Sequence, residues 1–134
     1  MSNGNVVMGE RRFMLMNAAD IRNGLGETNP GWVMGSFVKP GDLRYCGDFE
    51  IKEWDRRSMR RDWRNGEECG PEYIAVLDGT LTIVLGRAEK ALDIVEDGEV
   101  EVFANQRIIL AAGVWRKLKA SDNIKGLTVR SKRA

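Results

Sequence analysis

The chain has 134 residues, of which 43% are apolar and 31% are charged, and its formal net charge is +1. This length and composition predict one globular domain, residues 1–134, with a core that needs no disulfide or metal to hold it. With a net charge near zero, the protein has no overall electrostatic attraction to nucleic acid or to a membrane surface, so we expect neither as a partner.

The sequence contains no histidine. This excludes Ser-His-Asp and Cys-His catalysis, and it removes the commonest metal ligand. Any proton transfer would fall to a carboxylate, lysine, cysteine or tyrosine side chain.

The N-terminal residues predict no secretory or membrane segment. Residues 1–11 are polar and contain glycine, and we expect them to be flexible. The longest apolar run nearby, FMLM at 13–16, is too short for a signal peptide or a membrane span, so the cytoplasm is the expected location. Cys46 and Cys69 are too few for a secreted disulfide framework, and we expect reduced thiols.

The first elements along the chain are predicted to be short. Residues 11–17 predict a strand, and residues 17–26 predict a brief helix. Another strand is expected at 32–38. Apolar and polar side chains alternate in FEIKEWD, residues 49–55, which predicts a half-buried strand.

The next segment, residues 56–64, carries five arginines, at positions 56, 57, 60, 61 and 64. Three of them are four residues apart, as on one face of a helix, but the flanking segments have the period of two that is typical of strands. We therefore favour strand or irregular structure. Together with Trp54 and Trp63, the arginines could bind single-stranded nucleic acid or line a pocket. Overall neutrality and the acidic stretch 93–101 favour a solvated or internally paired face over nucleic acid.

Two Asp-Gly steps predict hairpin turns further along the chain. Residues 70–86 predict a strand, a tight turn at Asp78-Gly79 and a second strand. Residues 92–104 predict another hairpin, which turns at Asp97-Gly98.

The C-terminal part completes an all-β pattern. Residues 107–120 predict a strand, a glycine turn and another strand, and residues 125–132 predict the last strand. Short strands with a turn about every ten residues predict an all-β sandwich or barrel.

Two segments, PEYIAVLDGTLTIVLG at 71–86 and RIILAAGVWRKLKASDNIKGLTVRS at 107–131, resemble single-domain cupins. Glu72 and Gly79 keep the spacing of glutamate and glycine in the first motif of that family. The resemblance covers about residues 48–131. It implies an all-β, cupin-like jelly-roll β-barrel with a short N-terminal helical segment and a barrel core at about 30–131.

The chain departs from the cupin pattern at the metal ligands. The two histidines of the first motif would fall within 65–68, where the sequence reads NGEE, and Arg116 stands where the third histidine would be. Glu72 alone remains of the four ligand positions, so the resemblance implies a barrel without a metal or other cofactor. The glutamate and the third histidine of metal-binding cupins point into the same barrel mouth, so the resemblance implies that Glu72 and Arg116 face each other. An arginine stays charged when partly buried and would balance the carboxylate.

We therefore expect a cupin-like domain that binds a small polar or anionic ligand in the barrel without a metal. The expected ligand-binding residues are Trp54, Arg60, Arg64, Glu72 and Arg116. Glu72 and Arg116 would set the polarity of the pocket floor, and the other three would select the ligand near its mouth. An open, polar cavity on the order of a few hundred Å³ would favour this reading.

Two alternatives stay open. The chain could be a carboxylate-based enzyme of the isomerase or epimerase type, with Glu72 as general base and Tyr73 as acid, although neighbouring strand residues point to opposite faces. It could also be a structural or assembly module whose pocket is a relic, with Glu72 held in an internal ion pair. An apolar filling of the barrel would favour that module.

Two further features bear on ligands and partners. Glu67, Glu68, Cys69 and Glu72 offer ligands to a hard cation, but a solvated turn is favoured because adjacent strand residues alternate faces. We expect a homodimer, because the outer strands of a barrel offer a flat sheet to a partner.

Overall fold

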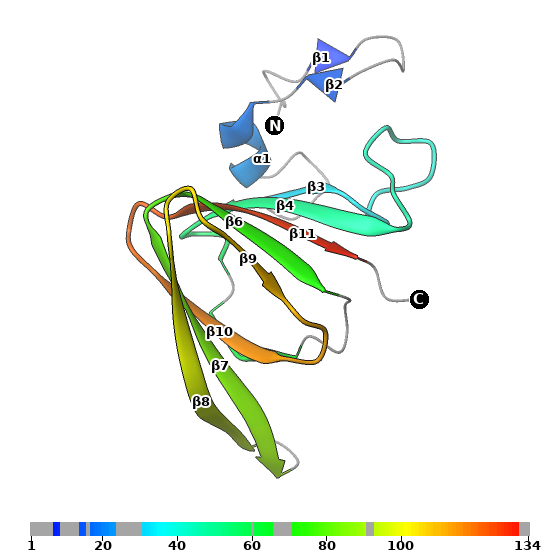
Figure 1. Ribbon diagram of the computed structural model, residues 1–134. Coiled ribbons are helices and arrows are strands. Elements are labelled where there is room, and N and C mark those ends of the chain that lie inside the picture. Colours follow the sequence, from blue (N-terminus) through cyan, green and yellow to red (C-terminus); the bar gives the residue numbers. More distant parts are fainter. Residues whose placement is uncertain are drawn as a thin grey trace.

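The computed structural model describes residues 7–8, 14–15, 17–23, 31–59, 61–65, 71–90 and 93–131 (Figure 1). Two antiparallel sheets face each other as the two layers of a flattened barrel, and a short helix lies on the outer side of the larger sheet. The all-β jelly-roll architecture that the sequence predicts is confirmed.

The larger sheet has five strands in the order β3-β4-β11-β6-β9. Their bounds are Trp32–Met34, Phe49–Asp55, Lys125–Ser131, Glu72–Asp78 and Arg107–Leu110.

The smaller sheet has four strands in the order β5-β10-β7-β8. Their bounds are Arg64–Asn65, Trp115–Ala120, Thr80–Lys90 and Asp93–Phe103. A separate pair, β1 (Val7–Met8) and β2 (Met14–Leu15), precedes the helix α1 (Ala18–Asn23).

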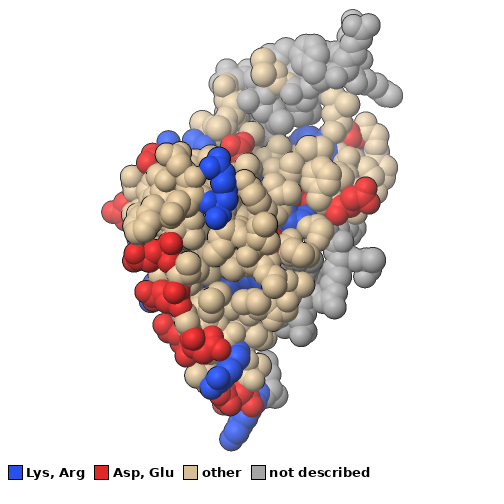
Figure 2. All heavy atoms as spheres, viewed as in Figure 1, with Lys and Arg blue, Asp and Glu red and all other residues tan. Residues whose placement is uncertain are grey.

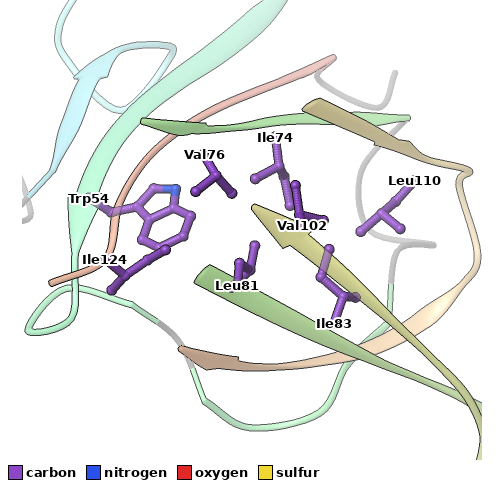
Figure 3. Packing of buried hydrophobic residues seen from close by; sticks show 8 residues of the cluster. All are labelled: Trp54, Ile74, Val76, Leu81, Ile83, Val102, Leu110 and Ile124. Carbon is purple, nitrogen blue, oxygen red and sulfur yellow. The ribbon is translucent and has the colours of Figure 1, made fainter. Parts of the chain in front are cut away.

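Alternating apolar side chains of both sheets fill the space between the layers (Figure 3). Ile74 and Val76 of β6 point across the gap toward Leu81 and Ile83 of β7, and all four are almost fully buried. Each side chain of this kind contributes about 1.5–3 kcal/mol when it leaves water. This packing forms the apolar end of the barrel and leaves the other end to polar residues.

The prediction of a hairpin at 70–86 is wrong. β6 and β7 belong to different sheets, so the turn at Asp78-Gly79 carries the chain from one layer to the other. The physical reason is that both strands have an apolar face, and these faces are buried when they pack against each other across the layers. Gly79 has a φ of 77°, which glycine adopts without strain.

The prediction of a turn at Asp97-Gly98 is also wrong, because both residues lie inside the long strand β8. In the pairing of β7 with β8, Gly98 lies opposite Leu85 and Glu96 lies opposite Gly86, so Asp97 is the extra residue of a β-bulge. β7 and β8 instead form one long hairpin with each other, in which the last paired residues before its turn are Lys90 and Asp93.

Both faces of β4 are covered. Trp54 points into the barrel, whereas Ile51 points outward and packs against a small cluster formed by Ile21 of α1 and Val33 of β3. Most residues of β4 are partly buried, so the half-buried strand that the alternation predicts is confirmed, and the helix lies over its outer face at Ile51.

Residues 56–58 form a turn after β4, and the two-residue strand β5 follows. The prediction of strand or irregular structure is confirmed for the described part of this segment, and Arg60 lies outside the described residues. Across the described chain, we find no helix of the length and apolarity needed to cross a membrane.

Candidate functional site

The polar end of the barrel is built on one row of charged residues in the larger sheet. Arg130 of β11 lies in register between Glu50 of β4 and Glu72 of β6. Residues directly opposite each other on antiparallel strands share a face, so all three side chains point toward the smaller sheet. Arg130 Nε donates to Glu50 Oε1 at 3.2 Å, and Arg130 Nη1 lies 4.0 Å from Glu72 Oε2.

The smaller sheet contributes two more arginines. Arg64 of β5 and Arg116 of β10 are register partners. Arg116 Nη1 lies 3.3 Å from Glu72 Oε1, and Arg64 Nη2 lies 3.3 Å from Glu72 Oε2. Glu72, which is only 2% exposed, therefore links the two layers of the barrel through both of its carboxylate oxygens.

Arg116 is held by more than its carboxylate partner. Its Nε donates to the carbonyl of Val114 at 3.1 Å, and its Nη2 donates to the carbonyl of Ala111 at 3.1 Å. The predicted pairing of Glu72 with Arg116 is confirmed. The backbone carbonyls of the turn between β9 and β10 fix the orientation of the guanidinium.

A small cavity of about 30 Å³ lies beside Glu72. A space of this size holds about one or two water molecules. Its charged and polar lining consists of Lys52, Arg64, Glu72, Thr128 and Arg130. Its apolar lining includes Trp32, Trp54, Met59, Ile74 and Leu118.

Trp32 lies beneath two of these cations. The guanidinium carbon of Arg130 lies 4.6 Å from the centroid of the indole ring, and Lys52 Nζ lies 5.4 Å from it. Lys52 Nζ also donates to the carbonyl of Ser58 at 2.8 Å. Cation–π contacts of this kind hold charged side chains in place near an apolar surface.

The structure brings together some of the residues that the sequence predicts for the site. Arg64 and Glu72 line the cavity, whereas Arg116 lies behind Glu72 and does not line it. Trp54 is 3% exposed and donates its indole N–H to Thr128 Oγ1 at 2.9 Å, so it is a core residue at the cavity wall and not a residue of the mouth. Arg60 lies outside the described residues.

Sequence reasoning missed Arg130, Lys52, Trp32 and Thr128. A signal was present in β11, where Thr128 and Arg130 alternate with Leu127 and Val129. The usual rule that apolar side chains face the core would place Leu127 and Val129 inside the barrel. The structure shows the opposite, because Thr128 and Arg130 line the cavity. The charged partners of Arg130 on β4 and β6 and the hydrogen bond from Trp54 to Thr128 make this choice of face favourable.

No family model matches the sequence, and no curated protein matches it. Among solved structures, protein BH2720 of Bacillus halodurans aligns over 96% of this chain and 87% of its own, with a TM-score of 0.57 and 12% identity. Hydroquinone 1,2-dioxygenase of Sphingomonas sp. TTNP3 aligns over 88% of this chain and 73% of its own, with a TM-score of 0.53 and 9% identity. A cupin-2 domain containing protein of Shewanella frigidimarina aligns over 63% and 69%, with a TM-score of 0.45 and 18% identity. The chain has a cupin-like jelly-roll fold.

A divalent metal does not fit this site. Both oxygens of Glu72 face guanidinium groups at 3.3 Å, and a third guanidinium lies at 4.0 Å, so a metal would be repelled by three positive charges. Within the described residues, no three His, Cys, Asp or Glu side chains lie together as metal ligands. Of the acidic cluster considered from the sequence, residues 67–69 lie outside the described part.

The alternative that this barrel is an enzyme requires Tyr73 as an acid beside the base Glu72, and the structure does not place Tyr73 there. Tyr73 follows Glu72 on β6 and points to the outer face of the sheet, where it is 37% exposed. Tyr73 therefore does not share the site with Glu72, as the alternation of strand faces requires.

Proposed function

We propose that this cupin-fold barrel binds a small organic anion by a carboxylate group, beside Glu72, without a metal. One observation carries the proposal: the cavity is lined by three cations, Lys52, Arg64 and Arg130, and by one carboxylate, Glu72. Glu50 and Arg116, which contact this group from behind, add one charge of each sign. The site therefore keeps an excess of positive charge.

The geometry around Arg130 suits an incoming carboxylate. Its Nε and Nη1 face Glu50 and Glu72, and its Nη2 makes no hydrogen bond or ion pair with a described residue. Arginine binds carboxylates through planar, charge-assisted hydrogen bonds, which are stronger in a site that excludes water. The nearby carboxylate of Glu72 disfavours a doubly charged group such as phosphate.

The apolar part of the lining suits the carbon atoms that adjoin the carboxylate of such a ligand. Trp32, Ile74 and Leu118 present aromatic and aliphatic surface to the cavity. A cavity that combines a few converging polar groups with an apolar wall is typical of small-molecule sites.

A second reading, a structural module with a relic pocket, is favoured by the apolar filling of the barrel and by the size and pairing of its polar site. The cavity of about 30 Å³ is far smaller than typical ligand sites, and Glu72 is already paired with Arg64 and Arg116 inside the protein. In that case the charged network only joins the two sheets.

Titration with acetate, butyrate and benzoate separates the two readings. Trp32 and Trp54 line the cavity, so carboxylate binding should change the intrinsic fluorescence, and calorimetry gives the affinity. Arg130→Gln should weaken carboxylate binding at least tenfold, with circular dichroism to verify its fold. The matched control is Arg87→Gln, since Arg87 is exposed and pairs with Glu89 away from the cavity. If no carboxylate binds the wild-type protein, the proposed function is wrong.

The absence of a metal requirement is tested separately. We expect the thermal midpoint of untagged protein to be unchanged after dialysis against EDTA, because the cations around Glu72 exclude a metal. A stoichiometric transition metal in elemental analysis of the purified protein would contradict the proposal.

A further inference from the structure

A second hollow of about 350 Å³ adjoins the barrel cavity. Met59 and Leu118 line both spaces, so one layer of two apolar side chains separates them. The outer hollow, which we call the basic groove, also contains the cations Arg56, Arg61, Lys117 and Lys119.

The basic groove is strongly positive. Four cations line it, and no carboxylate belongs to its described lining. Arg56 forms an ion pair with Asp122, Arg61 donates to the carbonyl of Arg56, and Lys117 lies over the ring of Trp63. One of the four positive charges is therefore offset by an ion pair with a described residue.

The topology explains why the basic groove lies at this place. β5 pairs with β10 only at Trp115 and Arg116, and further along β10 the turn after β4 lies beside the strand instead. Asp55 holds this turn by accepting from the backbone N–H groups of Arg57 and Ser58. The groove is the seam between the two sheets.

The size of the inner cavity limits what it can hold. A space of about 30 Å³ accommodates little more than a carboxylate group, so the rest of an organic ligand must lie elsewhere. The basic groove is the adjoining space, and its apolar floor of Met59, Leu118 and Ala120 suits a methylene chain. A methionine side chain has several rotatable bonds and moves aside at low cost.

We propose that the basic groove is a second anionic subsite for the same ligand and that Met59 is the movable partition between the two subsites. The ligand class is then an elongated organic molecule with an anionic group at each end, as in an α,ω-dicarboxylate. One end is bound beside Glu72 and the other lies among Arg61, Lys117 and Lys119. This inference rests on the proposed function, since it assigns the first end to the cavity.

The test compares dicarboxylates with monocarboxylates of the same length by calorimetry: succinate, adipate and suberate against butyrate, hexanoate and octanoate. At one chain length the dicarboxylate should bind at least tenfold more tightly than its monocarboxylate. Lys119→Gln and Arg61→Gln should remove this advantage and leave monocarboxylate affinity unchanged. Arg107→Gln, which removes one exposed cation outside both spaces, is the matched control and should keep the advantage.

The role of Met59 is tested by the association rate in stopped-flow tryptophan fluorescence. Met59→Ala opens the partition, so the rate for the preferred dicarboxylate should rise several-fold. An unchanged rate in a folded Met59→Ala protein would overturn the role of Met59.

The outcomes separate the two proposals. If monocarboxylates bind and no dicarboxylate binds more tightly, the second subsite is wrong and the proposed function stands. If the dicarboxylate advantage also disappears in Arg107→Gln, the effect is general charge attraction and the subsite is wrong. If neither series binds, the proposed function fails and the subsite fails with it.

Discussion

Glu72 is a charged side chain that almost no water reaches. A buried carboxylate without partners costs several kcal/mol, and Glu72 avoids this cost because guanidinium groups face both of its oxygens. The three arginines and two glutamates of the network leave one positive charge in excess, which is the property that an anionic ligand would use.

We expect strong coupling between Glu72 and Arg116. Arg116→Met should lower the free energy of unfolding by about 3–5 kcal/mol, because it leaves a buried carboxylate with weaker compensation. In the double variant with Glu72→Gln, much of this loss should be recovered, as measured by urea unfolding.

The control for this cycle is the exposed pair Arg87 and Glu89, whose side chains are 62% and 47% exposed. Exposed pairs contribute about 0–1 kcal/mol, so this second cycle should show little coupling. Coupling between Glu72 and Arg116 no larger than in the control would show that the buried pair is not specifically stabilising.

Asp55 connects stability to pH. Burial by itself would raise the pKa of Asp55, but hydrogen bonds from the backbone and side chain of Arg57 and from the N–H of Ser58 outweigh it, and the pKa lies below its ordinary value. A carboxyl group with a lowered folded-state pKa adds stability above its unfolded pKa of about 4, and this stability is lost as the pH falls through the folded-state pKa.

Asp55→Asn should therefore be less stable than the wild type at pH 7, and the two should converge as the pH falls below about 4. Asp48→Asn, at an exposed aspartate, is the control and should match the wild type at pH 7. Urea unfolding across the pH range measures the effect, and a stability difference independent of pH would argue against it.

At the scale of the elements, β4 and β11 fit together through a glycine. Gly126 pairs with Trp54, and a Cβ atom at position 126 would lie 2.3 Å from a ring carbon of Trp54. The indole therefore lies flat over the backbone of β11, where its N–H reaches Thr128. This packing positions one wall of the cavity.

Gly126→Ala should lower the free energy of unfolding by about 1–3 kcal/mol, because the new methyl group overpacks the site and displaces Trp54. Near-ultraviolet circular dichroism should report the changed environment of the indole. The matched variant Gly98→Ala should have little effect, because its new Cβ would meet the nearest side-chain atom at 3.7 Å. Equal stabilities of the two variants would contradict this account.

At the scale of the whole molecule, the charges are unevenly distributed over the smaller sheet. Figure 2 shows carboxylates gathered along the side of the molecule where β8 runs. The acidic residues of β8 are Asp93, Glu96, Asp97, Glu99 and Glu101. In the described sheet β8 is an edge strand, and charged side chains on an edge discourage pairing with another chain.

The larger sheet offers a more apolar outer face. Ile109, Tyr73 and Val129 are consecutive register partners across three strands, and Ile109 is 71% exposed. The homodimer expected from the sequence stays a prediction, and we place its contact on this face.

Sedimentation equilibrium should then show a dimer at micromolar concentration, and Ile109→Lys should shift it to monomer. Val95→Lys, at a 40% exposed position on β8, is the control and should leave the dimer intact. A monomeric wild-type protein would refute the prediction.

The positions of several strands and one side-chain pairing could be predicted from local patterns in the sequence. The alternation of side chains located the strands around Trp54 and at the C-terminus, and the spacing of Glu72 and Gly79 matched a cupin motif closely enough to pair Glu72 with Arg116. The strand positions depend on a period of two along one strand, which is visible without knowledge of any partner strand. The pairing of Glu72 with Arg116 depended on the resemblance to the cupin motifs.

Tertiary structure alone decided which strands pair and therefore which charges meet. An Asp-Gly step favours a hairpin turn but also occurs in crossovers and bulges, so the sequence could not tell that Asp78-Gly79 joins two sheets and that Asp97-Gly98 lies within one strand. Arg130 became a site residue only because β11 lies between β4 and β6. The reason is that strand pairing is a long-range choice set by the burial of whole faces, whereas sequence alternation is a property of each strand separately.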